Sequence, residues 1–414
     1  MKRKHLLTTA AFAIAFASSC TNEDAPMVAG SQDVNPDEIN FTTTTTRASV
    51  ALLSDMTSSL TGFTVYAIYT GDTTDEWLIA GDNNYVYSQD DSAWGWYDTA
   101  NAPEWPTEST QYPVNFYAIY ANDMTGITTS MASTLTSNTS NVVTADVTIQ
   151  EPTKQYDIIA TSTEAATKPS DGKLTLSFVH MLSKVNFGVV AGYKKDVYLN
   201  QLLLHNLDEN GTLDLTYLNW NISPNEYTAD YDVSSYLSST AYTGTDQSEA
   251  IATSITSNDN EGSLMLLPQQ ATESDVDIWS SDADPTGTYI CVHYRTEYDS
   301  DDEIGYAQAS SHPDYSSPSD DDEYGQTALY VKVGYPLTTN WSWGKGYTYN
   351  IKIGTVDASN GYLLDDYYYD ESGTKTKYPI DFDKEVGDPI SDGTIDFDIL
   401  VIDWDDSTTA IPVL

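Results

Sequence analysis

Cys20 is the first residue of the sequence whose type and position indicate a covalent reaction. A positively charged start and an apolar stretch from Leu6 to Ala17 precede it, and two serines separate Ala17 from Cys20. This is the arrangement of a secretory signal, and roughly 12 apolar residues are too few for the ~20 that span a bilayer as a helix. A cysteine at the cleavage point can take a diacylglycerol on its sulfur. We therefore predict a signal peptide over residues 1–19 and lipidation at Cys20; the alternative is an ordinary cleavage site with an incidental cysteine.

Arg47 is the second residue that invites chemistry, because the chain has only two other arginines, Arg3 and Arg295. Arg3 leaves with the predicted signal peptide, and Arg295 ends an apolar stretch that reads as a strand. Arg47 follows a run of threonines and precedes Ala48. An arginine-specific protease would therefore find one accessible site, between Arg47 and Ala48. A linker arginine without a role is an equally weighted alternative.

The residue types that hold metals or catalyse reactions are scattered. The four histidines beyond the signal peptide are far apart, and Cys291 is the only cysteine besides Cys20, so neither a zinc site nor a disulfide is expected. Acidic runs at 299–303 and 320–323 could offer oxygens to calcium, but adjacent acids more often face solvent. Nucleophile elbows and phosphate-binding glycine loops are missing from the sequence. We expect no cofactor, no metal and no enzymatic activity.

Charge and composition restrict the partners. The chain carries 62 acidic and 17 basic residues, a net charge of −45, which repels nucleic acid and anionic lipid. With 40% hydrophobic residues it can still build a core. Tryptophans and tyrosines gather between residues 77 and 105. They could stack on a glycan, although filling a core is the favoured interpretation.

Alternating apolar residues predict strands along most of the chain. Such runs occur at 63–69, 114–120, 174–178, 185–189 and 395–404, and abundant tyrosine and threonine favour strands. Asn210-Gly211 predicts a hairpin between its flanking strands. These patterns predict an all-β protein of β-sandwiches.

The predicted organisation follows from these signals and the composition shifts between them. Residues 20–47 read as a lipid-anchored tether and propeptide strand, and residues 48–180 as an N-terminal β-sandwich. Residues 181–414 read as a C-terminal β-sandwich that ends in a strongly apolar segment at 395–414.

Several short motifs occur in order along nearly the whole chain. They are the acylatable Cys20, the stretch from Ile39 to Ala48, the strands at 63–69 and 116–120, Phe178 to Val185, Leu266 to Gln269, Trp343 to Tyr349, and the terminal strand from Ile399 to Trp404. This ordered set resembles the fimbrillin family of Bacteroides-type bacteria. The resemblance implies two transthyretin-like β-sandwich domains in a fimbrial (pilus) subunit that serves adhesion, exported as a lipoprotein to the outer membrane and the cell surface.

The resemblance also implies how such subunits assemble. An arginine-specific protease cuts at the residue matching Arg47, and the strand carrying Ile39 and Phe41 leaves the N-terminal domain. A strand of a neighbouring fimbrial subunit then fills the groove by β-strand addition. The resemblance makes 395–414 the candidate donor strand, with Ile395, Phe397, Ile399, Val401, Ile402 and Trp404 as its candidate donor residues. The alternative is a non-polymerising surface lipoprotein that binds glycan or a host protein.

The anchoring hypothesis predicts the behaviour of Cys20→Ser. Without the thiol the chain cannot accept lipid, so metabolic labelling with a fatty acid should disappear and the precursor should stall or be released. Ser19→Ala, which keeps a small residue at the predicted cleavage site, should still be labelled. Normal labelling of Cys20→Ser would refute the prediction.

Overall fold

The computed structural model describes the chain between residues 37 and 403, with gaps. The described residues are 37–45, 62–70, 77–88, 93–121, 126–132, 142–191, 195–223, 228–234, 237, 242–243, 250–252, 264–269, 287–298, 331–353, 362–363, 367–369, 375–377 and 395–403. Among these residues no helix is long and apolar enough to cross a membrane.

Strands dominate the described residues, which confirms the all-β prediction. This part of the chain contains twenty-four strands, which form several sheets, and three short 3-10 helices. The 3-10 helices are η1 (Thr99–Asn101), η2 (Ser109–Gln111) and η3 (Pro152–Lys154).

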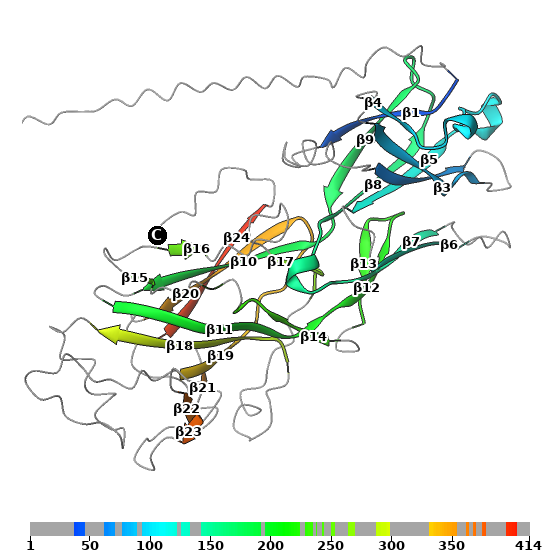
Figure 1. Ribbon diagram of the computed structural model, residues 1–414. Coiled ribbons are helices and arrows are strands. Elements are labelled where there is room, and N and C mark those ends of the chain that lie inside the picture. The colour runs from blue at the N-terminus through cyan, green and yellow to red at the C-terminus, as the bar shows by residue number, and fades with distance from the viewer. Residues whose placement is uncertain are drawn as a thin grey trace, which may run out of the picture.

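A seven-stranded sheet contains the first strand of the described chain (Figure 1). Its order is β1-β9-β8-β5-β2-β3-β4; β1 pairs with β9 in parallel, and the other neighbours are antiparallel. Its strands are β1 (Asn40–Thr45), β2 (Gly62–Tyr69), β3 (Trp77–Ser88), β4 (Ala93–Trp96), β5 (Val114–Ala121), β8 (Ile158–Ala166) and β9 (Lys173–His180).

Both faces of this sheet are buried at its centre. In β2, Phe63 and Val65 face one side and Tyr66 and Ile68 face the other, and all four are buried. Successive side chains of a strand point to opposite faces, so a strand that is apolar at nearly every position must separate two cores. The sheet therefore divides the N-terminal part of the molecule into two hydrophobic clusters.

A four-stranded sheet covers one of these faces, and its order is β13-β12-β7-β6. Its strands are β6 (Ile127–Ala132), β7 (Val142–Thr148), β12 (Asn210–Asp214) and β13 (Asn219–Asn221). β12 pairs antiparallel with β7, with Gly211 opposite Val147. The boundary near residue 180 stays a prediction, and this sheet joins strands from both sides of it.

The hairpin predicted at Asn210-Gly211 is wrong. β11 (Lys195–Asp208) ends just before this dipeptide, but it pairs with other strands in a different sheet from β12. Gly211 lies inside β12, where an added Cβ would meet Trp220 and Ile222 side chains at 3.1 Å. Close packing, and not a tight turn, accounts for glycine at this position.

Two further sheets form the other half of the molecule. The five-stranded sheet has the order β16-β10-β20-β24, and β17 pairs with β10 as well. The six-stranded sheet has the order β14-β11-β18-β19-β21, and β15 pairs with β11 as well. Their remaining strands, with the separate pair β22–β23, are β10 (Ser183–Ala191), β14 (Thr228–Asp232), β15 (Tyr242–Thr243), β16 (Ala250–Ala252), β17 (Leu264–Leu266), β18 (Tyr289–Tyr298), β19 (Val331–Pro336), β20 (Lys345–Ile353), β21 (Tyr362–Leu363), β22 (Tyr367–Tyr369), β23 (Lys375–Lys377) and β24 (Ile395–Asp403).

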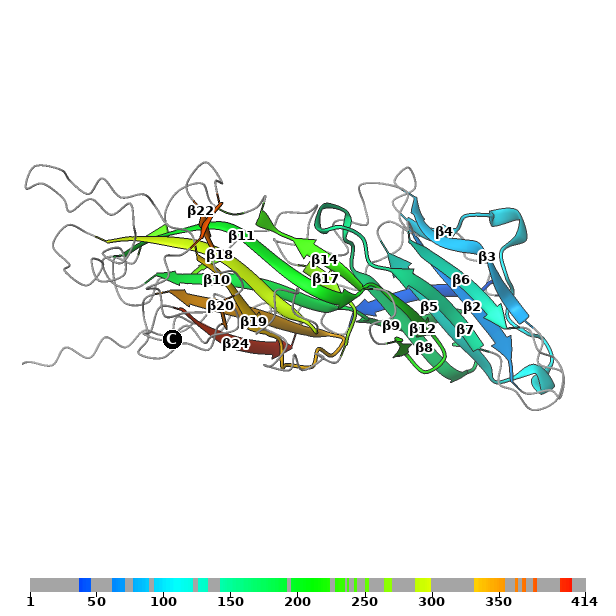
Figure 2. The same ribbon diagram turned by 90° about the horizontal axis from the view of Figure 1, so that it is seen from below.

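The molecule is elongated, with the blue and cyan strands at one end and the yellow to red strands at the other (Figure 2). Two cores lie along it. The first core, which contains Ile39, Phe41 and Trp96, lies on one face of the seven-stranded sheet. The second, here called the shared core, runs continuously from Tyr66 and Ile119 of that sheet through Leu213 to β18 and β20.

Backbone contacts at the junction tie the two halves together. The amide of Met181 donates to the carbonyl of Ile158 at 2.8 Å, and the indole of Trp220 donates to the carbonyl of Met181 at 2.7 Å. The amide of Gly344 donates to the carbonyl of Leu182 at 2.9 Å. Since one core and these bonds cross the junction, separating the halves would expose apolar surface on both.

We therefore expect a single cooperative unfolding transition. Leu213→Ala removes a fully buried side chain from the middle of the shared core and should cost about 2–5 kcal/mol of unfolding free energy. Calorimetry should show one transition that moves to lower temperature as a whole. Tyr217→Ala, at a nearby position with 61% exposure, is the matched control and should change little. Two transitions, with only one displaced by Leu213→Ala, would contradict the shared core.

Candidate functional site

The first strand, β1, lies at an edge of the seven-stranded sheet and completes the first core. Its residues pair in parallel with β9, from Asn40 opposite Lys173 to Thr45 opposite Phe178. Ile39 is fully buried and Phe41 is 5% exposed. Removing two such side chains from water contributes about 1.5–3 kcal/mol each, so this short segment is held mainly by its side chains.

Four aromatic rings surround Phe41. Its ring centroid lies 6.0 Å from Phe63, 5.0 Å from Tyr85, 5.7 Å from Trp96 and 5.8 Å from Phe116, each in an edge-to-face arrangement. Edge-to-face pairs at these distances add to the energy of burial. We call the site formed by these four residues and β9 the β1 groove.

Among the described residues, side chains rather than another strand cover the outer edge of β1. The indole Nε1 of Trp96 donates to the carbonyl of Ile39 at 2.7 Å. The backbone N–H of Phe41 donates to the hydroxyl of Tyr85 at 3.3 Å, and that hydroxyl lies 3.4 Å from Oδ1 of Asn40. These bonds satisfy backbone groups that an edge strand would otherwise offer to another chain.

The residues just before β1 are hydrogen-bonded to the connection between β4 and β5. The amide of Ile39 donates to the carbonyl of Pro103 at 2.8 Å, and the amide of Trp105 donates to the carbonyl of Asp37 at 2.7 Å. Lys168 forms an ion pair with Asp37 at 2.7 Å. The segment from residue 37 to residue 45 is thus held by backbone bonds on both edges and by buried side chains.

Burial perturbs two ionisable groups at this site. Burial raises the pKa of Tyr85 to about 12, so its hydroxyl stays protonated at neutral pH. Burial, and secondarily the charge of Glu104, raises the pKa of Glu38, which lies opposite Glu104 in an isolated bridge. The docked segment therefore carries one carboxylate whose ionisation opposes docking.

The candidate donor residues Ile395, Phe397, Ile399, Val401 and Ile402 lie in β24, and Trp404 is outside the described residues. β24 pairs antiparallel with β20 along its whole length, from Ile353 opposite Ile395 to Lys345 opposite Asp403. Ile399 is partly buried against the shared core, whereas Val401 is 49% exposed. In this structure the segment therefore belongs to its own chain's sheet. Cys20, Arg47 and Ala48 also lie outside the described residues.

Sequence reasoning did not identify the residues that line the β1 groove. It considered the aromatics at 77–105 as a glycan surface or as core, and Tyr85, Trp96 and Trp105 are all buried, which confirms the core interpretation for these three. Buried tryptophan and tyrosine need partners for their N–H and O–H groups. That requirement is the one sign in the sequence that these side chains bind the backbone of another strand, although the sequence does not show which carbonyl or amide is the partner.

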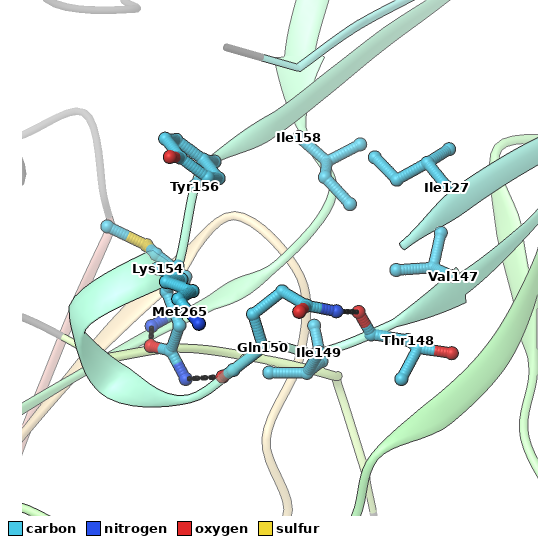
Figure 3. A pocket seen from close by; sticks show the side chains of 10 residues that line it. Ile127, Val147, Thr148, Ile149, Gln150, Lys154, Tyr156, Ile158 and Met265 are labelled. Atoms are coloured by element: carbon cyan, nitrogen blue, oxygen red, sulfur yellow. Dashed lines mark hydrogen bonds between the residues drawn. The ribbon is translucent and has the colours of Figure 1, made fainter. Parts of the chain in front are cut away.

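A small pocket beside β6 and β7 does not compete with the groove as a functional site (Figure 3). Its volume is about 20 Å³, which accommodates a single water. Gln155 beside it is already engaged, since its side chain accepts from the amide of Met265 at 2.7 Å and donates to the carbonyl of Gln150 at 3.0 Å. Across the described ranges, no three histidine, cysteine, aspartate or glutamate residues cluster as metal ligands.

The pKa of Glu38 gives a testable pH dependence. A carboxyl whose pKa is higher in the docked state stabilises that state in acid and loses this contribution as pH rises through the raised pKa. Glu38→Gln should therefore raise the melting temperature at pH 7, and the gain should shrink as pH falls toward 4.5. Glu108→Gln, at an exposed position beside η2, is the matched control. A gain for Glu38→Gln that is equal at both pH values would contradict this account.

Comparison with known proteins agrees with the fold. A family model described as fimbrillin-like matches residues 46–363. A fimbrial protein from Bacteroides vulgatus has a similar structure, with a TM-score of 0.54 at 13% identity over 89% of this chain and 99% of that chain. A proposed cell adhesion protein from Bacteroides uniformis gives a TM-score of 0.41 at 12% identity over 89% of this chain and 98% of that chain. No curated protein sequence matches. The chain belongs to the fimbrillin-like family.

Proposed function

We propose that this protein is a subunit of a bacterial surface fimbria and that it assembles by exchanging β1 for a strand of a neighbouring subunit. The observation that carries the proposal is the position of β1. It is an edge strand in which Phe41 is buried, the fully buried Ile39 directly precedes it, and the predicted cleavage site at Arg47 follows it. Family membership and the fimbrial relative support the same function.

Exchange fits the geometry of this edge better than simple addition. A strand added outside β1 would have to displace the indole of Trp96 and the hydroxyl of Tyr85 from the backbone of Ile39 and Phe41. It would also gain no buried site, because Ile39 and Phe41 already fill the groove. A strand that replaces β1 inherits both the side-chain sites and the backbone bonds.

Cleavage after Arg47 would be the trigger. Before the cut, release of β1 leaves it tethered beside the groove, so it rebinds at a high effective concentration. After the cut, the segment is held only by its non-covalent contacts, and a competing strand can take its place. Assembly is thereby delayed until the subunit meets an arginine-specific protease, which we place at the cell surface.

Delivery and adhesion complete the proposal. Lipidation at Cys20 would carry the precursor to the outer membrane, and the filament would serve adhesion to host glycan or protein. The net charge of −45 makes neighbouring subunits repel one another, so burial of an exchanged strand must supply the attraction. The alternative of a monomeric glycan-binding lipoprotein loses support because Tyr85, Trp96 and Trp105 are buried.

The decisive variant is Arg47→Ala, expressed in the bacterium that makes the protein. The variant should fold and reach the surface, but it should form no oligomers that resist boiling in detergent. Thr46→Ala retains the arginine and is the matched control, which should assemble normally. Wild-type assembly by Arg47→Ala would overturn the proteolytic switch and favour the monomeric alternative.

A further inference from the structure

The contacts around β1 define what any occupant of the groove must present. The first position needs an apolar side chain, since Ile39 is fully buried, and its carbonyl must accept from Trp96. The third position needs a large apolar side chain among four rings, as Phe41 provides. The second position, Asn40, places an oxygen 3.4 Å from the hydroxyl of Tyr85.

The pattern of the resident strand recurs near the C-terminus. Ile39-Asn40-Phe41 is matched by Ile395-Asp396-Phe397 at the start of β24. Aspartate has the size of asparagine and offers an acceptor oxygen to the same hydroxyl. The same tripeptide occurs a second time, as Ile380-Asp381-Phe382, so the tripeptide alone does not select one segment.

The next positions of the register separate the two segments. Positions 43 and 45 of β1 pair with Leu176 and Phe178 of β9, which are buried in the first core, and threonine occupies both. In the same register β24 supplies Ile399 and Val401, whereas the second tripeptide is followed by Lys384 and Val386. A lysine beside Leu176 would be desolvated at a cost, so β24 is the better occupant.

Two further differences favour β24 over the resident strand. The residue before its tripeptide is Thr394, so the exchanged strand would bring no carboxylate opposite Glu104, where Glu38 lies in the resident strand. In its own sheet β24 leaves Val401 49% exposed. Exchange would move this valine beside the buried Phe178. Two terms oppose it: the pairing with β20 is given up, and the carboxylate of Asp396 enters the buried position of Asn40.

Resting on the proposed function, we propose that Tyr85 selects the incoming strand and that Trp96 fixes its position in the groove. The selected strand is residues 394–401 of a second copy of this chain, parallel to β9, with Ile395 in the place of Ile39. Trp96 donates to the backbone carbonyl of the first position, which any strand offers, whereas Tyr85 donates to the acceptor side chain of the second position. The groove thus recognises an Ile-Asn/Asp-Phe strand that continues with apolar residues at every second position.

The register can be tested by intermolecular disulfides in the full chain. Thr42 pairs with the exposed Thr175, and their hydroxyls lie 3.0 Å apart. In the proposed exchange Asp398 takes the place of Thr42. Thr175→Cys combined with Asp398→Cys should therefore give disulfide-linked ladders from fimbriae oxidised on the cell. The same Thr175→Cys combined with Leu400→Cys is shifted by two residues and is the matched control, which should give none.

The outcomes of this experiment are distinct. Ladders only with Asp398→Cys support the register, and ladders only with Asp383→Cys, in the second tripeptide, overturn it in favour of that segment. Detergent-resistant oligomers without any disulfide ladder overturn the register but leave strand exchange standing. Chains that form no such oligomers even without the new cysteines overturn the proposed function, and the inference falls with it.

The role of Tyr85 is tested by a double-mutant cycle with Asp396, in which the rate of subunit release from detergent-resistant oligomers is measured. Tyr85→Phe removes the hydroxyl that accepts from the amide of the third position and donates to the side chain of the second. It should speed subunit release by at least about tenfold, whereas Tyr97→Phe, at an exposed neighbouring position, should not. Asp396→Ala should speed release in the wild-type background but add little in Tyr85→Phe, and Asp396→Asn should retain slow release. Additive effects of Asp396→Ala and Tyr85→Phe would mean that the tyrosine only supports the fold, and would overturn its role in selecting the incoming strand.

Discussion

The edge of the seven-stranded sheet has to be closed, and a single short strand closes it. Without β1 the first core would open beside Phe63, Tyr85 and Phe116, and the backbone of β9 would offer unpaired amides and carbonyls. Ile39 and Phe41 fill that opening, while Trp96 and Tyr85 finish the outer edge with side-chain hydrogen bonds. Burial and edge satisfaction thus both rest on one six-residue strand and on Ile39, which directly precedes it.

The opposite face of the same sheet is covered by a second sheet and not by a single strand. There the four-stranded sheet combines β7 with β12, whose residues come from the two sides of the predicted boundary. A continuous core then reaches from Ile119 through Leu213 to Ile290. The molecule therefore joins an edge strand on one face to an interlocked layer on the other. In the proposed exchange, removal of β1 would open the first core while the shared core would keep the subunit intact.

The sequence predicts the strands better than their partners. Alternation placed β9 around Leu174 to Phe178 and β10 around Val185 to Val189, as the structure has them, because a period of two is a local property. Asn210-Gly211 misled for the same reason: the dipeptide is a local turn signal, whereas glycine is needed because the pairing of β12 with β13 brings Trp220 and Ile222 against it. The contact of Phe41 with Tyr85 spans 44 residues, and no periodicity encodes which aromatic meets which strand.

The separation of the β1 groove from β24 has a consequence for the symmetry of the proposed assembly. The groove lies in the blue and cyan half of the molecule and β24 in the other half (Figure 2), so a link between them joins unlike surfaces. Such heterologous contacts do not pair off as a two-fold dimer does, and they produce open chains when the rotation does not close. In the proposed assembly, every filament would keep one vacant β1 groove and one unexchanged β24 at its opposite ends. Its growth would then have a fixed direction, and a terminal subunit that lacks one of the two surfaces would end it.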